Sequence, residues 1–489
     1  MLSPLTNCKK KELKKSPPLS KTALKQAARQ EKENEKKVRR KQKRQKIVKL
    51  ESLKQIQLNA AGLDIGASEI YACVPEGRDS RNVRSFATFT ADLNALADWL
   101  SKCGVQTVAM ESTGVYWIPV YQILEQRGFD VNLVNARQIK NVPGKKTDVL
   151  DCQWIQQLHS YGLLKASFRP SQDLCALRSI VRHRQMLTEY RAIHIQHIQK
   201  NLELMNLKLC SVLKDITGKT GMQIIRAICQ GETDSVKLAQ FRDPRCFSSQ
   251  DDIAKSLEGD YKFEHLFALR QAVQLYDHYS LLIETCDYEL EKHYSAIKCH
   301  KTVGTLPPLP KRRVKSLKNK PHFDLRTHLY ELCGVDLTSI DGIDVLTAQT
   351  VISEIGLDMS KWSTVKHFTS WLGLCPCNKI TGGKVFKTGS KKNTNRATLS
   401  LKIAARSLHA SKSALGAFYR RMRAKHGPMK ASMAAAHKMA RIIYFMLKSK
   451  KVYIDPGEKY YFEKYRHRIV RNLKRKAEAL GYDLTPICS

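Results

Sequence analysis

The sequence predicts an α/β domain, a long helical arm and a mostly helical C-terminal domain. Short apolar runs alternate with helical periodicity from residue 58 to about 165, which is typical of an α/β domain. Apolar positions then recur at three, four and seven residues, and a basic, proline-rich linker precedes a second compact region. The predicted boundaries are 1–57 for an N-terminal tail, then 58–165, 166–300, 301–322 for the linker, and 323–489.

The α/β domain starts with three short strands, which we predict at AAGLDIGA, EIYACVP and RSFATFTA because turn signals separate these apolar runs. Helical periodicity in ADLNALADWLSKCG and GVYWIPVYQILEQRG then alternates with the apolar strands TVAMES and DVNLVNA. Each of these two predicted helices ends at a glycine. The order βββαβαβ, followed by a helix that carries Asp148 and Asp151, is that of a ribonuclease-H-like fold.

The arm is predicted from an apolar seam between Ser171 and about Val212, which is typical of a coiled coil or a two-helix arm. The polar stretch CQGETDSVKLAQFRDPRCFSSQDD interrupts the helix, and HLFALRQAVQLYDHYSLLIETCDYELEKHY resumes it. Four arginines line the predicted arm and are candidates for contacts with RNA or DNA, with a merely solvated face as the alternative: Arg178, Arg182, Arg184 and Arg191.

In the C-terminal domain, LTSIDGIDVLTAQTVISEIG predicts a helix-hairpin-helix, with the turn DGID followed by a helix that ends at Gly356. Such turns offer backbone N–H groups to a nucleic-acid backbone. In the loop GGKVFKTGSKKNTNR, Gly382 and Gly383 would let the backbone approach a phosphate closely and Lys384 would supply charge. A basic surface turn is the alternative for this loop. Arg396, at its end, is a further candidate for nucleic-acid binding.

The charge of the chain points to a polyanionic partner. Its 489 residues carry a formal net charge of +39, and nucleic-acid phosphates are the partner that such an excess favours. The tail, residues 1–57, is too polar to bury a core and is predicted to be disordered or a solvated helix. Its stretch VRRKQKRQK favours a nucleic-acid-binding arm over a solubilising tail.

No apolar run of about 18 residues and no signal-peptide pattern is found, so we expect no membrane partner and a cytoplasmic, nucleoid-associated protein. The 14 cysteines are scattered along the chain and are predicted to be reduced thiols. A structural zinc site at Cys375 and Cys377 is disfavoured because this C-x-C pair has no second pair at the required spacing.

Four acids are predicted to share one edge of the sheet. Asp64 lies in the first strand, Glu111 ends the fourth, and Asp148 and Asp151 begin the closing helix, three residues apart and therefore on one face. Clustered carboxylates repel one another unless a cation neutralises them, and such oxygen ligands suit Mg²⁺ or Mn²⁺. Two such ions can assist phosphodiester cleavage. The alternative is that each acid is an ordinary cap or turn residue. Two lysines just before the helix would hold the phosphate backbone: Lys145 and Lys146.

These segments also carry a family resemblance. GLDIGA, MESTGVYW, NARQIKNVPGKKTDVLDCQW and LHSYGLL resemble the DEDD transposases, insertion-sequence recombinases related to the Piv and MooV invertases. The resemblance resumes at GVDLTSIDGI, WLGLCPCNKITGGKV, NRATLSLKIAARSL and SALGAFYRRM, and it covers most of residues 60–485. It does not cover the N-terminal tail or parts of the 212–320 region.

The resemblance implies a RuvC-like DEDD domain, a coiled-coil arm and a C-terminal transposase domain. It implies a recombinase that moves its own DNA element, guided by a noncoding bridge or seek RNA which that element encodes. The four acids would bind Mg²⁺, and a serine of the C-terminal domain would attack DNA to form a covalent phosphoserine link. The active site would be shared between protomers of a homodimer or homotetramer.

The expected nucleophile is replaced in this chain. Relatives have serine immediately before the paired glycines, where this chain reads NKITGGK, so the aligned residue is Thr381. Threonine keeps a hydroxyl, but its extra methyl stiffens χ1 and crowds in-line attack. Three alternatives follow: Thr381 is the nucleophile, a nearby serine such as Ser390 replaces it, or this copy does not cleave DNA.

Two functions of other classes therefore stand beside a DNA recombinase. One is a nucleic-acid-binding derivative that has lost cleavage, which the threonine at position 381 motivates. The other is a structure-selective nuclease that uses only the four carboxylates and metal-activated water. Protein–DNA adducts distinguish the recombinase from the nuclease, because only the recombinase forms them.

Overall fold

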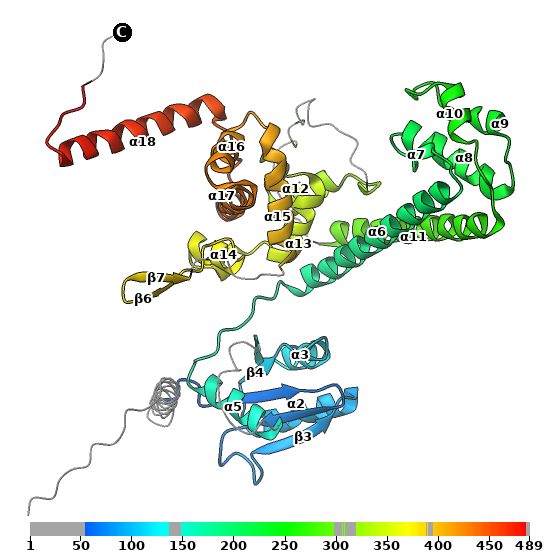
Figure 1. Cartoon of the computed structure of the whole chain (residues 1–489). Helices are drawn as coiled ribbons and strands as arrows, with labels where there is room; N and C mark the ends of the chain where they lie inside the picture. Colours follow the sequence, from blue (N-terminus) through cyan, green and yellow to red (C-terminus); the bar gives the residue numbers. More distant parts are fainter. Residues whose placement is uncertain are drawn as a thin grey trace, which may run out of the picture. The chain divides into compact units, whose positions relative to one another are not determined.

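The computed structural model describes residues 54–135, 148–297, 319–387 and 395–485, together with 306, 308 and 389. The chain divides into two compact units, Met1–Ser167 and Phe168–Ser489 (Figure 1). Within the described residues, no helix combines the length and apolar character needed to span a bilayer.

The first unit is built on a five-stranded mixed sheet with the order β3-β2-β1-β4-β5. Strands β2 and β3 pair antiparallel to β1, while β4 and β5 continue the sheet in parallel with it. The strands are β1 (Ala60–Ile65), β2 (Glu69–Cys73), β3 (Val83–Ala87), β4 (Thr107–Glu111) and β5 (Asp130–Val134). The helices are α2 (Thr90–Lys102), α3 (Trp117–Gln126) and α5 (Asp148–Ser160). The predicted order of strands and helices is confirmed, and it is consistent with a ribonuclease-H-like domain.

The alternating side chains of the strands separate the two faces of this sheet. Leu63 and Met110 are fully buried in the larger core, which also contains apolar residues of α2 and α3. The neighbouring positions point to the opposite face, which α5 covers. There Ala109, Val134 and Ile155 form a smaller buried cluster.

A close approach between backbones holds α5 on this face. A Cβ atom added to Gly62 of β1 would lie 2.2 Å from the amide nitrogen of Gln156 and 2.5 Å from the carbonyl oxygen of Cys152. No side chain fits this space, because atoms of both backbones would have to move. Glycine at position 62 therefore sets how closely the helix and the strand pack.

The second unit is mostly helical and begins with the arm, in which α6 (Gln172–Leu204) packs along α11 (Phe263–Ala296). The predicted apolar seam is buried here, for example at Leu187 and Ile283. Coiled-coil geometry itself stays a prediction. The arm is also joined to the C-terminal core, because Leu177 and Tyr294 are buried in the same cluster as the C-terminal helices.

The stretch between the two arm helices is a small folded head and not merely a polar interruption. Its helices are α7 (Leu209–Val212), α8 (Lys219–Gln230), α9 (Ser235–Ala239) and α10 (Gln250–Ser256). Buried side chains such as Ile224, Leu238 and Ile253 give it a core of its own at the end of the arm (Figure 1). This core was not predicted, because short amphipathic helices with many charged residues have a low average hydropathy.

The C-terminal part of the second unit surrounds one large apolar core. Its α-helices are α12 (Leu325–Cys333), α13 (Val345–Ile355), α14 (Val365–Trp371), α15 (Arg396–Ser407), α16 (Ala414–His426), α17 (Pro428–Ser449) and α18 (Gly457–Ala479). Three short 3₁₀ helices join them: η3 (Leu337–Ser339), η4 (Met359–Lys361) and η5 (Leu408–Ala410). A two-stranded hairpin, β6 (Lys379–Thr381) with β7 (Lys384–Lys387), projects beside α14 (Figure 1).

A buried ion pair joins the two arm helices. Arg184 of α6 and Asp287 of α11 are only 5% and 3% exposed, and the guanidinium of Arg184 donates to both carboxylate oxygens. Arg184 also donates to the backbone oxygen of Asn319, at 2.9 Å. Burial of one of these charges without the other would be unfavourable, so the pair fixes how the two helices align.

The Arg184→Met substitution should lower the free energy of unfolding by about 3–5 kcal/mol, because it leaves the Asp287 carboxylate buried without its cation. Combining it with Asp287→Leu should restore most of this loss. Thermal and denaturant unfolding measure both. Arg226→Met is a matched control, since Arg226 pairs with Asp277 at the surface, where such a pair contributes less than about 1 kcal/mol. Equal losses for the buried and exposed arginines would contradict the prediction.

The Gly62→Ala substitution should destabilise the first unit by about 3 kcal/mol or more, because the new methyl group would meet the backbone of α5. Gly77→Ala is the control. That site has open space but a φ of +79°, so it should cost only about 1–2 kcal/mol. Urea unfolding gives the loss of stability in both variants. The difference between the two losses is the cost of displacing α5, beyond the general cost of replacing a glycine. A Gly62→Ala variant as stable as the parent would show that α5 does not pack against β1 in this way.

Candidate active site

The close packing at Gly62 aligns α5 with β1, residue by residue. The side chain of Gln156 donates to the backbone oxygen of Ala60 at 3.2 Å, and the Cys152 carbonyl lies against Gly62. A helix turn of four residues rises about 6 Å, which is close to the length of two strand residues. The next step of this series brings Asp148 to the level of Asp64.

A second series aligns α5 with β4. The His159 ring nitrogen Nε2 lies 2.9 Å from the hydroxyl of Thr107, and Ile155 packs in one cluster with Ala109. Two residues further along β4 is Glu111, and four residues earlier on α5 is Asp151. By the same geometry, Asp151 comes to the level of Glu111.

The two series meet at one end of the sheet. Leu63 pairs with Met110 in the parallel β1–β4 ladder, so the following residues, Asp64 and Glu111, are neighbours on the face that α5 covers. We call Asp64, Glu111, Asp148 and Asp151 the acidic site. The three residues Asp64, Glu111 and Asp151 are half-buried, and Asp148 is exposed at the start of α5. The positive end of the helix macrodipole favours acids in this first turn.

The pKa shifts of two neighbouring residues, Tyr71 and Cys152, also reflect the charges of Asp148 and Asp64. A hydrogen bond to Glu69 is the main cause of the raised pKa of Tyr71, and the charge of Asp148 adds to it. Tyr71 is the ladder partner of Asp64 across β1 and β2. Beneath them, the pKa of the Cys152 thiol is raised by its hydrogen bond with Cys73, by burial and by the charge of Asp64.

The site supplies carboxylate oxygens, which are the ligands that Mg²⁺ and Mn²⁺ prefer. In the part of the chain that the structure describes, no three Asp, Glu, His or Cys side chains already converge on a common metal position. The shared level of the four acids therefore comes from the backbone. Lys145 and Lys146 lie outside the described residues.

Thr381 lies in the second unit, at the tip of the β6–β7 hairpin. Its ladder partner is Lys384, and the two residues between them, Gly382 and Gly383, have φ values of +57° and +75°. Positive φ at both central positions defines a type I′ turn, which glycine allows without strain. Thr381 and both glycines are exposed, and a Cβ at either glycine would meet no atom within 4 Å. Ser390 lies outside the described residues.

The arginines predicted to bind nucleic acid differ in their surroundings. Arg182 makes a bidentate ion pair with Glu354, with both N···O distances 2.7 Å, and Arg184 is buried against Asp287. Burial lowers the pKa of Arg178. Both the predicted nucleic-acid contact and its alternative, a solvated face, are therefore wrong for Arg184, whose side chain is only 5% exposed. Arg396 begins α15 and donates to Gln185 at 3.3 Å.

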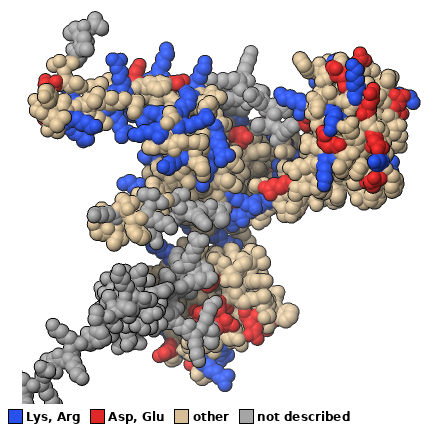
Figure 2. Space-filling view, viewed as in Figure 1, with Lys and Arg blue, Asp and Glu red and all other residues tan. Residues whose placement is uncertain are grey.

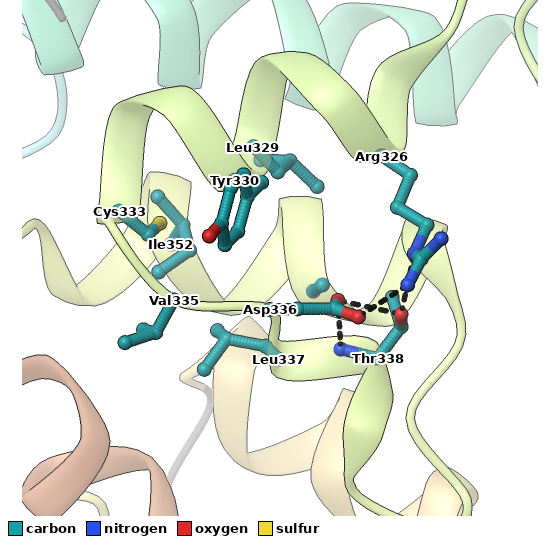
Figure 3. A pocket seen from close by; sticks show the side chains of 10 residues that line it. Arg326, Leu329, Tyr330, Cys333, Val335, Asp336, Leu337, Thr338 and Ile352 are labelled. Carbon is teal, nitrogen blue, oxygen red and sulfur yellow. Dashed lines mark hydrogen bonds and ion pairs between the residues drawn. The ribbon is translucent and has the colours of Figure 1, made fainter. Parts of the chain in front are cut away.

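The predicted helix-hairpin-helix turn is packed between two aspartate caps. Asp336 pairs with Arg326 at 2.6 Å and, as the N-cap of η3, accepts a hydrogen bond from the Thr338 amide (Figure 3). All three residues line one small pocket. Asp344 caps α13 by accepting from the Thr347 amide at 2.7 Å. α13 ends before Gly356 as predicted, whereas the element immediately before the DGID turn is the short 3₁₀ helix η3, which follows α12. The helix-hairpin-helix therefore stays a prediction.

Sequence reasoning missed the residue that sets how closely α5 packs on β1. Gly62 stands two residues before Asp64 and so shares its face of β1, and this glycine within an apolar strand was the available signal for a close backbone approach. Tyr71 was also missed, because strand register is needed to place it beside Asp64.

Comparisons with known families match both regions that carry these residues. A DEDD transposase model of the IS110 type, described as a transposase, matches residues 61–207, which include the acidic site. A model described as the transposase IS116/IS110/IS902 family matches residues 335–420, which include Thr381 and its hairpin. No curated protein matches the chain. The two family matches show that the chain belongs to the IS110 family of transposases.

Proposed function

We propose that this transposase cleaves and exchanges DNA strands with the acidic site and the hydroxyl of Thr381. The observation that supports the proposal best is the pair of contact series along α5, which brings two acids of the helix to the level of the acids on β1 and β4. The four acids come from three separate elements and share one level of the fold, which independent capping roles do not account for.

The donor set fits a divalent cation, and DEDD transposases are typically dependent on such metals. Asp64, Glu111, Asp148 and Asp151 would hold Mg²⁺ or Mn²⁺, because hard cations prefer several carboxylate oxygens. When bound, the cation would neutralise charge on the phosphate and lower the pKa of an attacking oxygen. The carboxylates would fix its position, and the rigid packing of α5 on β1 would keep them from separating.

The hairpin would present the nucleophile. The two glycines leave the surface beside Thr381 open, so a DNA backbone could approach its hydroxyl without meeting side chains at the turn. The hydroxyl oxygen would attack phosphorus and form a phosphothreonine link while the bond between phosphorus and the DNA oxygen breaks. The hydroxyl would lose its proton in this step, and the departing DNA oxygen would take one up. The β-branched side chain restricts χ1, which should make this attack slower than that of serine.

The finer features of the family remain part of the proposal. A guide RNA encoded by the element would choose the DNA sites, and the net charge of +39 supports binding of both nucleic acids. A homodimer or homotetramer would unite the acidic site with a hairpin, in a cytoplasmic, nucleoid-associated complex. RNA that copurifies with the protein and restores site choice would test the guidance.

A derivative that binds DNA without cleaving it remains the second candidate, because Thr381 replaces the expected serine. The third is a metal-dependent nuclease in which water attacks and no protein–DNA link forms. Variants of Asp148, Asp151 and Thr381 separate these candidates from the recombinase.

Asp148→Asn and Asp151→Asn should each reduce DNA cleavage about a thousandfold. Each variant loses the negative charge of one carboxylate ligand of the metal, which removes on the order of 4 kcal/mol of transition-state stabilisation. Both should leave DNA affinity nearly unchanged. Asp98→Asn is the matched control, since Asp98 is an exposed acid of the same unit that pairs with Arg127. Cleavage assays with Mg²⁺ and Mn²⁺ would measure this. Undiminished cleavage by both variants of the acidic site would exclude its metal role.

Thr381→Val keeps the shape of the side chain and removes its hydroxyl, so it should abolish the covalent protein–DNA adduct while DNA binding persists. Thr381→Ser removes only the methyl group and should raise cleavage or leave it unchanged. Denaturing gels and mass spectrometry of the linked peptide detect the adduct. Activity of the serine variant alone would identify this copy as silenced. Full cleavage by the valine variant would point to Ser390 or to water as the nucleophile.

A further inference from the structure

Helix α18 (Gly457–Ala479) projects from the second unit without burying any residue. It lies beyond the segment that the second family model matches, which ends at residue 420. From Arg466 to Ala479 all side chains are exposed except that of Ala477, which is half-exposed. A solitary helix in water gains little stability from its own hydrogen bonds, so a helix of this kind indicates a partner that covers it.

The first two turns of α18 are held firmly. Glu458 pairs with Arg420 of α16 at 2.6 Å, and the hydroxyl of Tyr461 accepts from Arg421 at 2.6 Å. The Arg421 guanidinium also lies 4.3 Å from the ring centre of Tyr465, as a cation–π contact. These contacts orient the helix at its base while its outer part stays open to solvent (Figure 1).

The outer part carries a continuous basic face. From Lys464 to Lys476, the sequence KYRHRIVRNLKRK holds seven lysines and arginines and no acid. Four of these residues recur at intervals of four, three and four, so they share one side of the helix. This basic stripe consists of Lys464, Arg468, Arg471 and Arg475. Figure 2 shows Lys and Arg side chains along the length of the projecting helix.

We propose that α18 is a docking helix for duplex DNA, which enters the major groove with its basic stripe against the phosphates. The B-DNA major groove, about 12 Å wide, admits an α-helix, whereas the deep and narrow major groove of an RNA duplex does not. The stripe matches the closely spaced phosphates in charge. Because the side chains of the outer helix are exposed, the groove can take up this helix without displacing packed residues.

The proposal uses the DNA substrate of the family but does not depend on the cleavage chemistry. It assigns to α18 a DNA contact remote in sequence from both the acidic site and the β6–β7 hairpin. The exposed apolar side chains Ile469, Val470 and Leu473 lie away from the stripe, and a second copy of the chain or an anionic membrane is the competing partner for them.

The test compares two charge-matched double variants of the full chain. Arg468→Gln with Arg475→Gln removes two charges from the stripe, and Lys459→Gln with Arg466→Gln removes two from the opposite side of the same helix. Both pairs are seven residues apart, and all four residues are exposed. Because α18 buries nothing, both variants should keep the parental circular dichroism and melting temperature.

Binding to a 30-base-pair DNA duplex of arbitrary sequence is measured by fluorescence anisotropy over a range of salt concentrations, with EDTA present to prevent cleavage. The stripe variant should lower the slope of log Kd against log salt by about 2, because about two phosphate contacts are lost. The control variant should change it by less than about half as much. An RNA duplex of the same sequence and phosphatidylserine vesicles serve as competing partners.

A smaller salt slope for DNA in the stripe variant alone supports the proposal. Equal effects of the two variants would overturn it, since total charge and not the stripe would then matter. A loss confined to the RNA duplex or to the vesicles would also overturn it, as would an unchanged DNA slope with an altered oligomeric state. Inactivity of the acidic site or of Thr381 affects none of these measurements.

Discussion

The contact between Gly62 and the backbone of α5 is the constraint on which the candidate active site depends. Without a side chain at this position, the helix lies directly on the strand, and hydrogen bonds from Gln156 to Ala60 and between His159 and Thr107 fix its register. A helix held by its backbone in this way cannot slide by a residue without losing several contacts together. The positions of Asp148 and Asp151 along the sheet follow from that register.

Much of the first unit could be predicted from sequence, because its pattern of short strands and glycine-ended helices is strong. The order of its elements and the helix that starts at Asp148 were both predicted. The alignment of α5 with β1 and β4 could not be, because it depends on a backbone distance at Gly62 that no hydropathy pattern encodes. The role of each acid therefore stays a prediction, although the fold places all four at a common level.

The second unit was harder to predict because a charged residue in its sequence can lie at the surface or in a buried ion pair. Arg182 and Arg184 look alike in a basic helix, yet one pairs with Glu354 and the other is buried with Asp287, and these acids lie far away in the sequence. The head of the arm likewise resembles a polar interruption in the sequence, because its apolar residues are divided among four short helices. Long-range pairing and tertiary packing decide both cases, and neither leaves a local signal.

The length of the arm sets the distance between the C-terminal core and the head. Its two helices contain 33 and 34 residues, and a head with its own core closes their far end. Because each residue adds about 1.5 Å, inserting seven residues in both helices would move the head outward by about 10 Å and turn it by only about 20°. Insertions of three or four residues would instead swing the apolar seam out of alignment. The reach of the arm can therefore change in steps of seven residues while the apolar seam between its two helices stays aligned.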